Sequence, residues 1–189
     1  MESNGSITSL PRFSDYELAD YLAFELARYY CTVTGESYFN VAVGYNPYYD
    51  LASASGNIAI EIKLDRMAMK TNNVFIETKD ILHNKPSGIA ATKSNLWLHA
   101  VPLKQPNSMR CYEWDVESLK LFCSDYQPVS NYAHTALGYI IPIKTFGNSA
   151  TRVFDFETKF WSRIVFGSKE KEEGENGDII NPYDESPPF

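Results

Sequence analysis

The clearest pattern in the chain is a strict alternation of apolar and other side chains over residues 58–65. The stretch reads IAIEIKLD, with an apolar residue at every even-numbered position. Successive side chains of a strand point to opposite faces of the sheet. The pattern therefore predicts a β-strand over 58–65 with one buried face and a second face that carries both a carboxylate and an ammonium group.

The remaining hydrophobic pattern predicts three helices and several further strands. Ser14, followed three residues later by Glu17, forms a capping box that opens a helix of about sixteen residues, ending near Tyr30. A glycine-containing loop and a short helix are expected over 86–95. The other expected elements are strands over 38–45, 74–79, 96–101, 137–146 and 152–157, and a helix over 115–126. This order predicts an α/β domain with a mixed β-sheet.

Length and charge indicate one globular domain followed by a tail. The chain has 189 residues, of which 44% are hydrophobic, and it is long enough to bury a core. Residues 168–189 hold seven acids and two lysines, so they carry −5 of the formal charge of −7. We therefore expect a nearly neutral domain over 1–167 and an acidic, disordered tail over 168–189.

Several classes of protein are disfavoured by the same sequence. The first residues contain no basic segment followed by an apolar run, and no apolar run approaches the ~18 residues of a transmembrane helix. The three cysteines are widely spaced, which fits free thiols in a reducing compartment. The three histidines do not have zinc-ligand spacing. We expect a cytoplasmic protein without a membrane segment.

The polar face of the 58–65 strand suggests a metal site. Glu61 and Lys63 share this face, and Asp50, eleven residues before Glu61, is expected on a neighbouring strand. Two carboxylates, helped by the Ile62 carbonyl, form a set of oxygen ligands that suits Mg²⁺. Lys63 beside such an ion could hold a water molecule or stabilise charge developing on a phosphate. Such a set suits hydrolysis of a phosphodiester.

Asp50, Glu61 and Lys63 at this spacing resemble the D…(D/E)xK signature of the PD-(D/E)XK nuclease superfamily. The segment TNNVFIETKDILHNKPSGIAATKSNLWLHAV, residues 71–101, is similar to the segment that follows ExK in small phage-type endonucleases and Holliday-junction-resolvase-like members. The resemblance extends over roughly residues 14–102. It implies a restriction-endonuclease-like core, in which a mixed central β-sheet is flanked by helices.

The resemblance also implies a role for each matching residue. Asp50 and Glu61 would bind Mg²⁺ or Mn²⁺, and Lys63 would be the catalytic lysine. A glutamate of the first helix, Glu25 or Glu17, would add a ligand, although capping alone explains Glu17. Family members commonly carry a polar residue for DNA contact where Thr92 or Lys93 stands here. Apart from the resemblance, Lys70 and Lys85, in loops, are further candidates for contact with DNA phosphates. The implied protein is a homodimeric, magnesium-dependent DNA endonuclease that acts on branched or structured DNA in phage replication or recombination.

Two other interpretations of the sequence stay open. Glu61 and Lys63 could form an ion pair on a solvated strand face, without catalysis. The chain ends in DESPPF, which is similar to the acidic tips of single-stranded-DNA-binding proteins. Asp184, Glu185 and Phe189 are the residues expected to bind a replication or recombination partner. The alternatives are therefore a non-catalytic, single-stranded-DNA-binding protein and a degenerate nuclease fold kept for assembly contacts.

Overall fold

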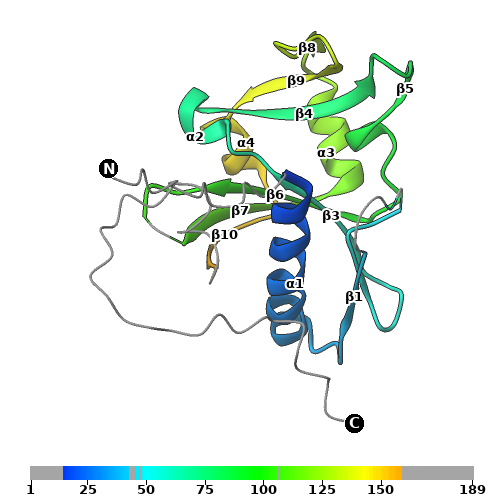
Figure 1. Ribbon diagram of the computed structural model, residues 1–189, viewed down its shortest axis with the longest axis vertical. Helices are drawn as coiled ribbons and strands as arrows, with labels where there is room; N and C mark the ends of the chain where they lie inside the picture. Colours follow the sequence, from blue (N-terminus) through cyan, green and yellow to red (C-terminus); the bar gives the residue numbers. More distant parts are fainter. Residues whose placement is uncertain (1–14, 43–45, 47, 106, 159–189) are drawn as a thin grey trace, which may run out of the picture.

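The computed structural model describes residues 15–42, 46, 48–105 and 107–158 (Figure 1). Its elements, in chain order, are α1 (Asp15–Thr34), β1 (Phe39–Val41), β2 (Leu51–Ser53), β3 (Ala59–Leu64), α2 (Ala68–Thr71), β4 (Asn73–Asp80), β5 (Lys85–Pro86), the 3₁₀ turn η1 (Gly88–Ala90), β6 (Leu96–Pro102), β7 (Ser108–Asp115), α3 (Val116–Cys123), β8 (Val129–Ser130), β9 (Ala136–Pro142), α4 (Ile143–Ser149) and β10 (Arg152–Glu157).

The strands form two sheets. The larger sheet has the order β1-β2-β3-β6-β7-β10, in which β3 and β6 run parallel and the other neighbours run antiparallel. The smaller sheet is antiparallel, with the order β5-β4-β9-β8. The predicted mixed central sheet flanked by helices is confirmed, whereas the second sheet was not predicted.

Hydrophobic side chains pack on both faces of the larger sheet. On one face, α1 covers the sheet, and its apolar side chains share a core with Ile60 and Ile62 of β3. On the other face, the smaller sheet, α3 and α4 enclose a second core that includes Trp97 and Phe146. Figure 1 shows α3 and α4 between the two sheets, with α1 on the far side of the larger one. β3 therefore lies between two packed layers.

The first helix forms because its apolar residues recur at helical spacing. Four residues placed four apart each have at most 3% of their surface exposed: Leu18, Leu22, Leu26 and Tyr30. The predicted helix is confirmed and runs four residues past Tyr30, while Ser14, its expected N-cap, lies outside the described residues. No helix within the described ranges is long and apolar enough to cross a membrane.

A buried polar network fixes α1 to the far strands of the larger sheet. The Tyr30 hydroxyl donates a hydrogen bond of 2.5 Å to Glu113 Oε2 of β7, and Arg152 of β10 donates to the same oxygen at 2.6 Å. Burial, followed by the Glu113 charge, raises the pKa of Tyr30 above its usual range, so the hydroxyl keeps its proton and stays a donor.

Three of the predicted strands are confirmed with small shifts, since 58–65 corresponds to β3, 96–101 to β6 and 152–157 to β10. The strand predicted over 137–146 is wrong in its second half, where β9 ends at Pro142 and α4 begins. Pro142 has no N–H with which to continue a strand ladder. Phe146, in the middle of α4, is fully buried in the second core, which favours the helix.

Other predicted elements are present with different limits. The helix predicted over 115–126 spans only Val116–Cys123, because Asp115 ends β7 and its carboxylate caps the helix by accepting a hydrogen bond from the Ser118 N–H at 2.8 Å. The short helix expected within 86–95 is the single turn η1, and the strand over 74–79 is β4 of the smaller sheet. The 38–45 strand is described only as β1, because 43–45 lie outside the described residues.

The hairpin of β2 and β3 leaves part of β3 extending past its partner. Leu51 pairs with Ile60, and Ala52 pairs with Ala59. β2 begins at Leu51, whereas β3 continues to Leu64 and is paired on its other side with β6. After Ile60, the edge of β3 that faces β2 is therefore not paired with β2, and a side chain can bond to its main-chain groups.

Gly88 brings the loop after β4 into close contact with that strand. It has a φ of +51°, and a Cβ at this position would lie 2.3 Å from the main-chain oxygen of Glu77. Gly56, in the turn between β2 and β3, has a φ of +74°, but a Cβ there would meet nothing within 4 Å. The two glycines therefore share a left-handed backbone conformation and differ in how much space surrounds them.

We expect Gly56→Ala to lower the free energy of unfolding by about 1–2 kcal/mol, the cost of a left-handed conformation for a residue with a Cβ. Gly88→Ala should lower it by about 1–3 kcal/mol more, because the added methyl group also overlaps the backbone of β4. Urea denaturation followed by circular dichroism measures both values. Equal losses for the two variants would contradict the close packing of this loop.

Candidate functional site

Asp50 lies directly before β2 and is bonded to the edge of β3. Its N–H donates a hydrogen bond to the Ile60 carbonyl at 2.9 Å, and its Oδ2 accepts one from the Ile62 N–H at 2.6 Å. β2 begins only at Leu51, so the Asp50 carboxylate accepts the bond that a main-chain carbonyl would accept if β2 began earlier. Because the N–H and C=O of a strand residue point to the same edge, the Ile62 carbonyl opens toward Asp50 as well.

Glu61 and Lys63 are adjacent on the face of β3 that lies opposite Ile60 and Ile62. Lys63 Nζ is 2.6 Å from Glu61 Oε1, and the side chains are 41% and 12% exposed, respectively. The ammonium group also lies over the ring of Trp97, 5.7 Å from its centroid. The Lys63 side chain is thus partly exposed, while that of Glu61 is mostly buried.

The charges of this cluster act on one another. Burial is the largest effect on Asp50, and together with the nearby Glu61 carboxylate it raises the Asp50 pKa to about 6. Burial lowers the pKa of Lys63, but the charge and hydrogen bond of Glu61, with the charges of Asp50 and Glu77, outweigh it and raise that pKa. The side chains predicted at Asp50, Glu61 and Lys63 are therefore brought together in one electrostatic cluster.

A carboxylate that the sequence reasoning did not select, Asp20 of α1, also belongs to this environment. Its charge contributes to raising the pKa of Asp50. Glu25 is five residues further on, about 140° around the helix, so the two acids lie on different sides of α1. Asp20 borders Ala23 and Ala27, two small residues on the buried side of α1. This position was the signal in the sequence that could have indicated Asp20. Glu25 stays a prediction as a metal ligand.

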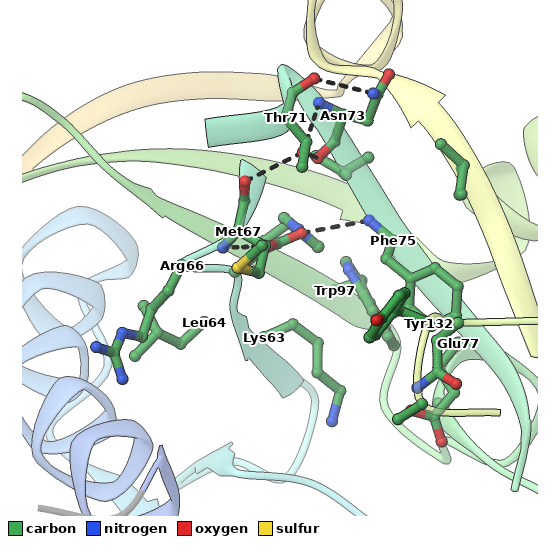
Figure 2. A pocket seen from close by; sticks show the side chains of 17 residues that line it. Lys63, Leu64, Arg66, Met67, Thr71, Asn73, Phe75, Glu77, Trp97 and Tyr132 are labelled. Carbon is green, nitrogen blue, oxygen red and sulfur yellow. Dashed lines mark hydrogen bonds and ion pairs between the residues drawn. The ribbon is translucent and has the colours of Figure 1, made fainter. Parts of the chain in front are cut away.

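Glu77 reaches the cluster from the smaller sheet. It lies on β4, and its charge is among those that raise the pKa of Lys63. Lys63 and Glu77 line one cavity, and Figure 2 shows both side chains at the same end of it. Two sheets therefore contribute to the site, although the sequence pattern had suggested one.

Of the four residues predicted to contact DNA, Thr92 is closest to the cluster. Its hydroxyl donates a long hydrogen bond of 3.4 Å to Glu61 Oε2. Lys93 follows it and is exposed, whereas Lys70 is exposed on α2 and Lys85 on β5, at the edge of the smaller sheet. The structure brings Thr92 to the site, and the three lysines stay predictions as phosphate contacts.

Asp50 and Glu61 are the candidate metal ligands. Within the part of the chain that the structure describes, no group of three or more His, Cys, Asp or Glu side chains is arranged to hold a metal ion. Mg²⁺ commonly uses one or two protein carboxylates and completes its octahedron with water and other oxygens. Two carboxylates that repel one another, with the Ile62 carbonyl on the same edge, fit that requirement.

Comparison of the chain with protein-family models and with curated proteins found no match. The class that the structure establishes is therefore an α/β protein with a mixed central sheet flanked by helices. Any functional assignment depends on the chemistry of the cluster around Asp50, Glu61 and Lys63.

Because the pKa of Asp50 is raised, the contribution of this side chain to the free energy of unfolding should depend on pH. The folded protein keeps the Asp50 proton up to about pH 6, whereas an ordinary aspartate, with a pKa of 3.8, loses it earlier. The contribution of Asp50 to wild-type stability therefore falls as the pH rises through this window. We expect the stability of Asp50→Asn relative to wild type to rise by up to about 3 kcal/mol between pH 4 and pH 7.

Urea denaturation of both proteins at several pH values measures this change. Asp125→Asn, at an exposed position after α3, serves as the reference for removing one negative charge from the surface. The Asp50 result is the difference between the two variants. A pH-independent difference would show that Asp50 is not crowded by burial and by Glu61.

Proposed function

We propose that this protein is a metal-dependent DNA endonuclease of the PD-(D/E)XK type. The observation that carries the proposal is the joining of Asp50, Glu61 and Lys63 at the edge of β3. Asp50 bonds to the Ile62 N–H at 2.6 Å, and Lys63 lies 2.6 Å from Glu61. Carboxylates next to a partly exposed ammonium group suit hydrolysis of a phosphodiester, because each can act on charge that develops during the reaction.

The carboxylates of Asp50 and Glu61, with the Ile62 carbonyl, would hold Mg²⁺ or Mn²⁺. When bound, such an ion polarises a phosphate and lowers the pKa of a coordinated water. The Ile62 N–H fixes one Asp50 oxygen, which leaves Oδ1 to face a cation. Glu61 positions the Lys63 ammonium, and this group can orient the attacking water or stabilise the phosphate oxygens. Thr92 holds Glu61 from its other side through Oε2.

The electrostatics of the cluster support this role. Burial and the Glu61 charge raise the Asp50 pKa, so ionising Asp50 in the folded protein carries an electrostatic cost. A divalent ion held by these carboxylates would reduce that cost. In a purely structural ion pair, Lys63 would neutralise Glu61. Burying Asp50 beside them would add an electrostatic cost against which only its bond to the Ile62 N–H counts.

The wider proposal concerns the substrate and partners. The overall charge of −7 includes −5 from residues 168–189, so the charge of the rest does not oppose contact with DNA. Lys93, Lys70 and Lys85 are the proposed phosphate contacts. We place the enzyme in the cytoplasm, as a homodimer that addresses two strands of branched or structured DNA in phage replication or recombination.

The alternative function is a non-catalytic, single-stranded-DNA-binding protein that recruits a partner through its acidic end. Its candidate partner-binding residues, Asp184, Glu185 and Phe189, lie outside the described residues. This alternative makes no use of the shared environment of Asp50 and Glu61. The endonuclease accounts for that environment, and the two functions differ in whether the protein cleaves DNA when Mg²⁺ is present.

Glu61→Gln and Lys63→Ala should each reduce Mg²⁺-dependent nicking of plasmid DNA and cleavage of branched oligonucleotides by at least about 100-fold. The reason is that Glu61→Gln weakens a proposed metal ligand, whereas Lys63→Ala removes the ammonium group proposed to act on the water or the phosphate. Gel electrophoresis with Mg²⁺, with Mn²⁺ and with a chelator measures the loss. Circular dichroism and urea denaturation establish that the variants stay folded.

A matched pair on α3 provides the control. Lys120 Nζ lies 2.8 Å from Glu117 Oε1 on an exposed surface, so Glu117→Gln and Lys120→Ala remove the same chemical groups away from the site. They should leave cleavage unchanged. DNA binding by the wild type with no cleavage under any metal condition would establish the non-catalytic alternative, and neither activity would indicate a degenerate fold.

A further inference from the structure

A cavity of about 660 Å³ opens beside the proposed catalytic cluster, between β3 and β6 of the larger sheet and the strands of the smaller sheet (Figure 2). Its volume is that of a site for a small organic group. Lys63 and Glu77 belong to its wall, so the cavity is continuous with the cluster. The other side chains that matter here are Phe75, Trp97, His99 and Tyr132.

Two aromatic side chains, Phe75 and Tyr132, line this cavity, and the fold fixes the position of each. The Phe75 ring lies directly over Gly138 of β9, where a Cβ would come within 2.6 Å of a ring carbon. Tyr132 is fully exposed in the turn between β8 and β9. That turn is held by Asn131, whose Oδ1 accepts hydrogen bonds from the N–H groups of Thr135 and Ala136 at 2.9 and 3.2 Å. Figure 2 shows both rings on the same side of the cavity.

The wall formed by β6 carries hydrogen-bonding groups that the protein leaves unmatched. Trp97 and His99 are at most 1% exposed, and neither Trp97 Nε1 nor His99 Nδ1 has a partner among the described residues. Asp65 occupies the other ring nitrogen, His99 Nε2, at 3.1 Å. Buried polar atoms are rarely left without a partner, so these two nitrogens give the β6 wall unused hydrogen-bonding capacity.

The charges of the cavity favour a neutral ligand over an anion. Of its two cationic lining residues, Lys63 is paired with Glu61, and Figure 2 shows the Arg66 guanidinium directed away from the two aromatic rings. Asp65 and Glu77 add negative charge to the lining. Inside the cavity an anion would lie beside Asp65 and Glu77, whereas a flat, neutral, hydrogen-bonding group would meet aromatic rings. A nucleobase has that chemistry, and aromatic side chains bind unpaired bases by stacking.

We propose that this cavity receives an unpaired nucleobase next to the scissile phosphate, with Tyr132 and Phe75 stacking against it. The inference rests on the proposed endonuclease, because Lys63 is shared by the cavity and the catalytic cluster. It narrows the substrate class to DNA with a single-stranded segment at the cut, such as a flap, a gap or a branch point. A fully paired duplex would first have to unpair that base, at an energetic cost.

Binding in a chelator tests the cavity without cleavage. The probe is a single-stranded oligonucleotide with one 2-aminopurine, whose fluorescence falls when it stacks. Tyr132→Ala should bind this probe roughly 5- to 100-fold more weakly than wild type, the effect of losing one stacked ring. Tyr38→Ala, which removes a 55% exposed tyrosine before β1, should bind as wild type does. The same probe in a fully paired duplex should bind at least about tenfold more weakly.

Equal affinity for single strand and duplex, or equal effects of the two tyrosine variants, would overturn the cavity proposal. Cleavage of flap and duplex substrates then separates this proposal from the endonuclease. A wild type that cuts both equally, with no effect of Tyr132→Ala, would retain the nuclease and remove the base site. A wild type that binds through Tyr132 but never cuts would retain the base site and remove the nuclease.

Discussion

The hydrogen bond from the Ile62 N–H to the Asp50 carboxylate is the interaction on which the site depends. The pairing of β2 with β3 reaches only as far as Leu51 and Ile60. The next N–H of β3 on that edge, that of Ile62, therefore has no main-chain acceptor from β2. A buried donor without a partner is costly, and the Asp50 side chain supplies the acceptor. The same bond that completes the sheet therefore brings a carboxylate to the polar face of β3.

The position of β3 between two packed layers explains why these polar groups can be held so closely. Ile60 and Ile62 fill the core beneath α1, and their burial fixes the register that sends Glu61 and Lys63 to the opposite face. There, Lys63 lies over the ring of Trp97, and Glu77 of the smaller sheet lines the same cavity. Burial raises the cost of each charge, and pairing offsets part of it. Such a conflict between stability and charge is characteristic of functional sites.

The central part of the fold and the three charged residues could be predicted because they depend on local patterns. Alternation over 58–65 determined which side chains of β3 share a face, and helical spacing located α1. The smaller sheet could not be predicted, because the pairing of β4 with β9 joins segments far apart in the chain. Asp20 was missed as a member of the site for the same reason, since its proximity to Asp50 arises from packing. The helix after Pro142 was mistaken for strand because apolar residues surround that proline.

The hairpin turn between β2 and β3 has a consequence for the distance in sequence between Asp50 and Glu61. Gly56 lies there in open surroundings, so the chain could be longer or shorter at this turn while both ends of the hairpin keep their places. The interval between Asp50 and Glu61 thus reflects hairpin length, whereas the one-residue interval between Glu61 and Lys63 is imposed by strand geometry. Distant relatives should keep the second interval and vary in the first, which makes them hard to detect by comparing sequences at fixed spacing.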